Sequence, residues 1–199
     1  MRKILLSMDT NMNNIELQNA IVTKSYYSRE ELAAFIENQK TKNLVESGIY
    51  NSKESKVDVE YRNSLQVRVN NSNPFINKLR QLIATLNETR FKVSISEYCA
   101  ENDFVEYNVD GKFEQHKDVL WPVSVFDHDK NPVRKLTTVV LLNDDFTGGK
   151  LALWSKGERY SFSFEPGDVV TFPSYIHHKV DPVLSGTRYT AVSWSYGEF

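Results

Sequence analysis

The sequence predicts a mainly β domain with flanking helices, arranged as a β-sandwich or jelly roll. The second half contains many short β-branched or aromatic segments separated by turn residues, and the first half contains two segments with helical periodicity. A chain of 199 residues, 40% hydrophobic and 25% charged, is long enough for one core and short for two. We therefore expect a single domain over residues 1–199, with 1–100 as a supporting region of helices and strands and 101–199 as the jelly-roll core.

Two helices are predicted in the first half. Ser28 and Glu31 have the spacing of a capping box, and an apolar stripe follows, so a helix is expected at roughly 29–39. Pro74 after Asn73 opens a second helix, in which apolar residues recur at helical spacing until about Asn87. Residues 42–64 between the helices are polar and are expected to be irregular.

Strands are predicted wherever β-formers alternate between turns. The segment 136–142 is apolar on nearly both faces, so we expect it at the centre of the fold, between a cavity and the supporting elements. The helices should pack outside the sheet. The other expected strands are 65–69, 104–109, 150–154, 160–164, 169–172 and 188–196.

Charge and cysteine content restrict the class of partner and the compartment. The net charge of −2 disfavours a nucleic-acid or membrane partner. Cys99 is the only cysteine, which excludes an intramolecular disulfide, and the apolar run near the N-terminus is too short for a signal peptide or a membrane span. We expect a cytoplasmic protein that does not bind membranes.

His116, Asp118 and His178 form a candidate ligand set for non-haem Fe(II), because two imidazoles and one carboxylate on one face of the ion leave positions open for other ligands. Residues two apart in a strand project to the same side, so His116 and Asp118 should face inward and Lys117 away. Only the fold can bring His178 to them. The alternative is a surface histidine beside charged neighbours, because short motifs often match by chance.

Two other histidines compete for a role at the metal. His177 should point away from His178 on an extended segment, and the spacing favours His178 as the ligand. His128 lies in a polar stretch that ends at Pro132 and is expected in a solvated loop. We further hypothesise that residues 119–133, which include Trp121 and Phe126, and residues 42–64 flank a substrate entrance.

Arg188 is the candidate anion-binding residue. Its strand face also carries Thr190, Val192 and Trp194, which is typical of an interior face. A buried guanidinium needs an anionic partner, and a carboxylate bound through two hydrogen bonds is the natural one. That carboxylate belongs either to a bound acid or to the protein itself.

Several motifs occur in a fixed order over about residues 101–196. They are residues 107–118, Leu141-Leu142-Asn143, Gly148-Gly149, Pro166-Gly167-Asp168, Phe172-Pro173-Ser174, His178-Lys179-Val180, Pro182-Val183, Gly186-Thr187-Arg188-Tyr189 and Trp194. In this order and spacing they resemble the Fe(II)- and 2-oxoglutarate-dependent dioxygenases of the prolyl 4-hydroxylase type. The resemblance implies a double-stranded β-helix, another name for this kind of jelly roll, and the first hundred residues match only loosely.

The resemblance implies a role for each matching residue. His116, Asp118 and His178 look like the iron ligands, and Arg188 looks like the partner of the distal carboxylate of 2-oxoglutarate. Tyr107 resembles a tyrosine near the cosubstrate, with ring packing as the alternative. Trp194 is expected to pack in the core, with lining of the cavity as the alternative. Leu141 stands where some prolyl hydroxylases place a tyrosine, a departure that affects how the cosubstrate would be held.

The function implied by the resemblance is hydroxylation of a C–H bond, first of all on a prolyl residue of a peptide or protein, with release of succinate and CO2. Fe(II), 2-oxoglutarate and O2 would be required, with ascorbate as a further candidate. The alternatives are an oxygenase acting on a small molecule or a nucleic acid, and an inactive jelly-roll binding module, since fold alone does not confer activity.

Overall fold

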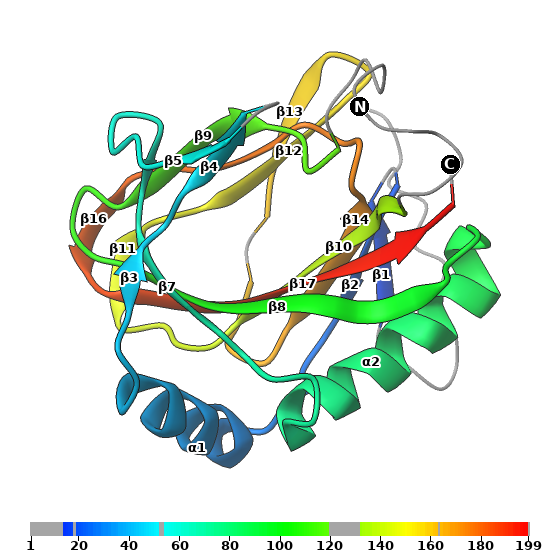
Figure 1. The fold of residues 1–199 in the computed structure, drawn as a ribbon, viewed down its shortest axis with the longest axis horizontal. Helices are drawn as coiled ribbons and strands as arrows, with labels where there is room; N and C mark the ends of the chain where they lie inside the picture. The colour runs from blue at the N-terminus through cyan, green and yellow to red at the C-terminus, as the bar shows by residue number, and fades with distance from the viewer. Residues whose placement is uncertain (1–13, 18, 52–53, 120–131, 163, 199) are drawn as a thin grey trace.

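The computed structural model describes residues 14–17, 19–51, 54–119, 132–162 and 164–198. It confirms the predicted mainly β fold with flanking helices. Two antiparallel sheets face each other, and the two α-helices lie against the outer side of the larger sheet (Figure 1). Within the described residues, no helix combines the length and the apolar character needed to cross a membrane.

The larger sheet has eight strands and contains the strand predicted to be central. That strand, β10, lies between β14 and β17, so both of its edges are hydrogen-bonded. In spatial order the sheet consists of β1 (Asn14–Leu17), β2 (Ala20–Thr23), β14 (Val169–Pro173), β10 (Val133–Leu141), β17 (Arg188–Gly197), β8 (Glu97–Tyr107), β7 (Leu65–Arg68) and β3 (Val45–Glu46).

The smaller sheet has five strands, and two short antiparallel pairs of strands accompany the two sheets. The five strands, in spatial order, are β13 (Glu158–Ser161), β12 (Leu151–Ser155), β15 (His178–Val180), β9 (Lys112–His116) and β6 (Arg62–Asn63). The two pairs are β11 (Phe146–Gly148) with β16 (Val183–Gly186), and β4 (Ile49–Asn51) with β5 (Glu54–Lys56).

Both helices begin where their capping residues predict. Helix α1 (Arg29–Lys40) has Ser28 as its N-cap, with the complete capping box formed by Glu31. Helix α2 (Pro74–Leu86) begins after Asn73, whose side chain accepts a hydrogen bond from a free N–H of the first turn. A single π-helical segment, η1 (Asn87–Phe91), follows α2 directly.

Two apolar clusters hold these layers together. The outer cluster joins α1 and α2 to the sheet through residues such as Phe35, Leu79 and Phe104. The inner cluster fills the space between the two sheets and includes Tyr107, Val139 and Phe172. Residues alternate between the faces of a strand, so β10 contributes Val139 to the inner cluster and Val140 to the outer one. This double burial explains its nearly continuous apolar sequence.

The structure corrects three expectations. Residues 42–64 are not irregular, because they contain β3, β4, β5 and β6. These strands are short, so period-two alternation has too few residues to be recognised. The segment predicted at 160–164 is β13, which begins earlier, at Glu158, and ends at Ser161. Strands β1 and β2 at the edge of the large sheet were not predicted at all.

Candidate metal centre and adjoining cavity

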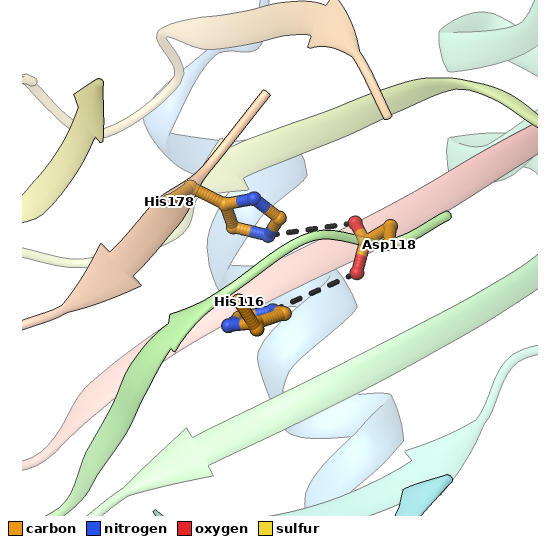
Figure 2. A group of neighbouring side chains, drawn as sticks. All are labelled: His116, Asp118 and His178. Atoms are coloured by element: carbon orange, nitrogen blue, oxygen red, sulfur yellow. Dashed lines mark ion pairs between the residues drawn. The ribbon is translucent and has the colours of Figure 1, made fainter. Parts of the chain in front are cut away.

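His116, Asp118 and His178 converge although 60 positions separate the last two in the sequence. One ligand atom from each lies within 4.8 Å of the others (Figure 2). Nε2 of His116 lies 3.6 Å from Oδ1 of Asp118, and Nε2 of His178 lies 3.5 Å from Oδ2. The two imidazoles therefore approach opposite oxygens of one carboxylate, leaving room between the three groups for a single ion.

Strand pairing produces this convergence. Strand β9 ends at His116, β15 begins at His178, and these two residues are direct partners in the antiparallel ladder. Asp118 lies two residues beyond the end of β9, not within a strand as we expected. Its backbone N–H donates a 3.0 Å hydrogen bond to the carbonyl of Ser174, which fixes the segment beside β14.

Backbone carbonyls set the orientation of both imidazole rings. Nδ1 of His116 lies 2.7 Å from the carbonyl oxygen of Glu114, and Nδ1 of His178 lies 3.0 Å from that of Ile176. A carbonyl can only accept, so each Nδ1 carries a proton, and in the neutral form of the ring Nε2 is the atom with the lone pair. Both lone pairs are on the ring atoms that lie toward Asp118.

Asp118 is held by residues that the sequence did not identify as its partners. The hydroxyl of Thr137 and the indole N–H of Trp194 both donate to Oδ2, at 2.7 Å and 2.8 Å. The Thr137 hydroxyl is also 2.9 Å from that of Ser174. Trp194 is buried as expected, and the alternative role is present as well, because this residue also lines the cavity and contacts Asp118. No local pattern would have identified Thr137.

The protonation states fit a divalent cation. Burial lowers the pKa of His178 to about 4, so its imidazole is neutral at pH 7. Burial opposes ionisation of Asp118, but the positive charges that His178 and His116 carry when protonated, together with the charge of Arg134, outweigh it and hold the pKa of this carboxyl below its usual range. Two imidazole nitrogens and one carboxylate are a donor set that suits Fe(II) and leaves open positions.

Arg188 is one of the most deeply buried side chains, with 1% of its surface exposed. Burial lowers the pKa of its guanidinium to about 10, yet the group remains charged at pH 7. Among the described residues, no Asp or Glu forms an ion pair with it. The alternative in which Arg188 serves one of these carboxylates therefore lacks its partner, which favours a bound acid.

The surroundings of Arg188 fix the position of its side chain. The ring of Tyr107, its partner across β8 and β17, lies 5.3 Å from the guanidinium carbon. Asn143 is hydrogen-bonded to the backbone on both sides of Arg188, donating to the carbonyl of Thr187 and accepting from the N–H of Tyr189, each at 2.7 Å. Tyr107 is itself buried in the inner cluster, so the packing role expected as an alternative is present.

Gly149 provides the space beside the Arg188 side chain. A Cβ at this position would lie 2.8 Å from Cδ of Arg188, and the φ of +58° also disfavours any other residue. The paired glycines recognised in the sequence therefore have a local reason, because one of them allows the backbone to approach the buried arginine.

A cavity of about 1060 Å³ reaches the metal centre. His116, Asp118 and Trp194 line it, whereas Arg188 and Tyr107 do not. Lys117 also lines it, which corrects the expectation that this side chain points away. His177 borders the cavity but lies outside the group of three converging ligands, as the spacing predicted.

Of the two segments hypothesised to flank a substrate entrance, residues 42–64 lie largely within the described part of the chain and residues 119–133 largely outside it. Gly48, Ile49, Tyr61 and Arg62, all from residues 42–64, line the cavity. Residues 120–131, with Trp121, Phe126 and His128, lie outside the described part of the chain. The residues that adjoin them on each side, Val119 and Pro132, line the same cavity.

Comparison with known sequences finds similarity in the second half of the chain. Residues 103–196 match the 2OG-Fe(II) oxygenase superfamily. A PKHD-type hydroxylase of Synechococcus sp. strain CC9605 is 41% identical over 68 residues, which are 33% of this chain and 31% of that protein. The chain thus spans about a third of the length of this curated relative.

Comparison with solved structures extends the likeness over most of the fold. A prolyl-4-hydroxylase from Pseudomonas putida superposes with a TM-score of 0.71 at 16% identity, covering 92% of this chain and 94% of that one. A viral collagen prolyl hydroxylase from Paramecium Bursaria Chlorella virus-1 gives a TM-score of 0.69 at 16% identity, covering 90% and 96%. At these identities the likeness establishes the shared fold.

Proposed function

We propose, from the match of residues 103–196 to the 2OG-Fe(II) oxygenase superfamily, that this chain is an Fe(II)- and 2-oxoglutarate-dependent hydroxylase acting on a prolyl residue of a peptide or protein. The observation that carries the proposal is the convergence of His116, Asp118 and His178 within 4.8 Å. The buried charge of Arg188, which has no carboxylate partner among the described residues, supports it independently, because it suits a dicarboxylic acid.

Each residue of the proposed site has its own role in binding or positioning. His116 and His178 present Nε2 lone pairs to the metal, and Asp118 supplies a negative charge that offsets part of the metal's charge. Arg188 holds the distal carboxylate of 2-oxoglutarate, with the Tyr107 ring against its guanidinium. When bound, Fe(II), O2 and 2-oxoglutarate supply the oxidising chemistry, with release of succinate and CO2. No side chain is needed as a separate general acid or base.

The proposed substrate class rests on two supports. The matching relative is named a PKHD-type hydroxylase, and the two solved structures are named as prolyl hydroxylases, one of them acting on collagen. The cavity beside the metal centre, at about 1060 Å³, is large enough for several residues of a peptide. A cytoplasmic location is likewise proposed, and cell fractionation tests it.

The experiment is an anaerobic titration with Fe(II) and then 2-oxoglutarate, followed by measurement of succinate after admission of O2. We expect binding of both and slow succinate release without peptide, stimulated by prolyl peptides from a library. Arg188→Met should raise the Kd for 2-oxoglutarate at least tenfold while metal binding persists. Arg188→Lys keeps the charge and serves as the variant with less risk of misfolding.

A matched control is Arg159→Met, since Arg159 is an exposed arginine paired with Asp181. It should bind 2-oxoglutarate as the unaltered protein does. Metal binding without any 2-oxoglutarate binding would refute the proposed function and favour an inactive binding module. Peptide-independent succinate release that no prolyl peptide stimulates would retain the oxygenase and reject the prolyl substrate.

A further inference from the structure

Two buried hydrogen-bond acceptors in the wall of the cavity have no hydrogen-bond donor among the residues that the structure describes. They are Oδ1 of Asp103 and Oε1 of Gln66, and both residues line the cavity. Asp103 is only 3% exposed. Buried polar atoms are almost always paired, so two such acceptors in one wall, beside a metal centre, indicate a ligand that supplies donors.

The two acceptors project from neighbouring strands of the large sheet. Strands β7 and β8 lie side by side in Figure 1. Gln66 lies on β7 opposite Val105, and Asp103 lies two residues before Val105 on β8, so the register makes the two residues diagonal neighbours on one face. Diagonal positions in an antiparallel pair are about 7–8 Å apart. The same face of β8 continues to Tyr107, next to Arg188, so these acceptors lie along the sheet from the proposed cosubstrate site.

The charged groups around Asp103 do not supply the hydrogen bond that its Oδ1 lacks. Nε of Arg68 lies 3.3 Å from Oδ1 as an ion pair, but without the geometry of a hydrogen bond, and the Arg68 side chain is more than half exposed. Burial raises the pKa of Asp103, an effect that the charges of Arg68, Arg62 and Arg134 only partly offset. A donor aimed at Oδ1 would therefore stabilise the ionised carboxylate.

The hydrogen-bonding chemistry of the possible ligands limits which of them could bind to Gln66 and Asp103. 2-Oxoglutarate carries acceptors only, so it cannot bind to either atom. A cationic group would have the donors, but three guanidinium groups line this cavity, those of Arg62, Arg68 and Arg134, and they outnumber the two carboxylates that lie outside the metal centre, Glu101 and Asp103. Their repulsion disfavours a cation and leaves neutral N–H groups as the fitting donors.

We propose that Gln66 and Asp103 accept hydrogen bonds from two alternate backbone N–H groups of an extended peptide substrate. This inference rests on the proposed function and specifies how its substrate is recognised. In an extended chain the N–H groups of residues i and i+2 point to the same side, and two residues rise about 6.6 Å, which fits the diagonal spacing of the two acceptors. The residue between them needs no N–H on that side, so a proline is accommodated there.

The test combines two variants with N-methylated peptides. Gln66→Met and Asp103→Leu remove the acceptors and keep similar volume, so each should raise the KM for the best prolyl peptide of a library about tenfold and change kcat less than threefold. N-methylation of the residue before or after the proline should raise the KM of the unaltered protein by a similar factor. In the variant that lacks the matching acceptor, the same methyl group should raise the KM no more than about twofold.

A second readout separates binding from a structural role. An unpaired buried acceptor destabilises the free protein, so both variants should keep or raise the Tm, whereas a structural role predicts a lower one. Ser195→Ala is the matched control, because Ser195 Oγ is the third buried atom without a hydrogen bond and does not line the cavity. It should leave the peptide KM within twofold of the original.

Three outcomes would overturn the inference. They are equal increases in the peptide KM on N-methylation in the variants and in the unaltered protein, a lowered Tm with an unchanged KM, and a library that yields no peptide substrate. Succinate release by the unaltered protein without peptide reports on the proposed oxygenase chemistry separately. A failure of the peptide arms alone therefore does not count against that chemistry.

Discussion

Replacing Thr137 by valine is expected to weaken binding of a divalent metal about tenfold. Valine keeps the shape of the side chain and removes the hydroxyl that donates a 2.7 Å hydrogen bond to Oδ2 of Asp118. This residue is 1% exposed, so water cannot take over the role of the hydroxyl. The carboxylate then loses one of the two donors that orient it toward the metal.

The magnitude follows from the strength of the lost bond. A hydrogen bond to a charged group contributes about 1.5–3 kcal/mol, but the Trp194 donor and the metal still hold Asp118 in place. We therefore expect the lower end, about 1.5 kcal/mol, which corresponds to a change in Kd of roughly tenfold. Loss of a residue that supports a metal ligand commonly costs about 10–100-fold in metal affinity.

The assay is calorimetric titration of the metal-free protein with Co(II) or Mn(II), which do not need exclusion of O2 to the degree that Fe(II) does. Thr138→Val is the matched control. Thr138 is the next residue on β10, equally buried, and its hydroxyl pairs with Thr171 on the other face of the sheet. The reasoning would be refuted if the two variants bound the metal equally tightly.

Three further results are expected. Asn143→Ala should weaken 2-oxoglutarate binding and lower the free energy of unfolding by about 2–4 kcal/mol, because it leaves the Thr187 carbonyl and the Tyr189 N–H unpaired, and calorimetry with chemical denaturation measures both. Leu79→Ala, at a fully buried site of the outer cluster, should cost about 2–5 kcal/mol by denaturation without changing metal affinity. The metal-free protein should lose stability as the pH falls from about 6.5 to 4, by up to about 3 kcal/mol, because the His178 pKa of about 4 lies below its usual value and the unfolded chain takes up the proton first. A His178→Gln protein with the same pH dependence over that interval would contradict this last expectation.

Local signals in the sequence predicted the parts of the fold that depend on local physics. The capping box of Ser28 and Glu31 and the Asn73-Pro74 pair mark the starts of both helices, because caps act within one turn. The apolar segment 136–142 predicted a doubly covered central strand for the same reason, since burial on each face selects each residue type. The short strands of residues 42–64 were not predicted, because two or three residues are too few to show the alternation of apolar and polar residues that marks a strand.

In the candidate site, too, local sequence and tertiary structure determined different features. The sequence by itself determined which residue types are available: two histidines and an aspartate with ligand chemistry, and an arginine on an apolar strand face. Only the tertiary structure decided that the three ligand atoms lie within 4.8 Å of one another, that Thr137 and Trp194 hold Asp118, and that Gln66 and Asp103 face the cavity without donors. Such contacts join strands far apart in the chain, and the register that creates them depends on the packing of the whole sheet rather than on any local pattern.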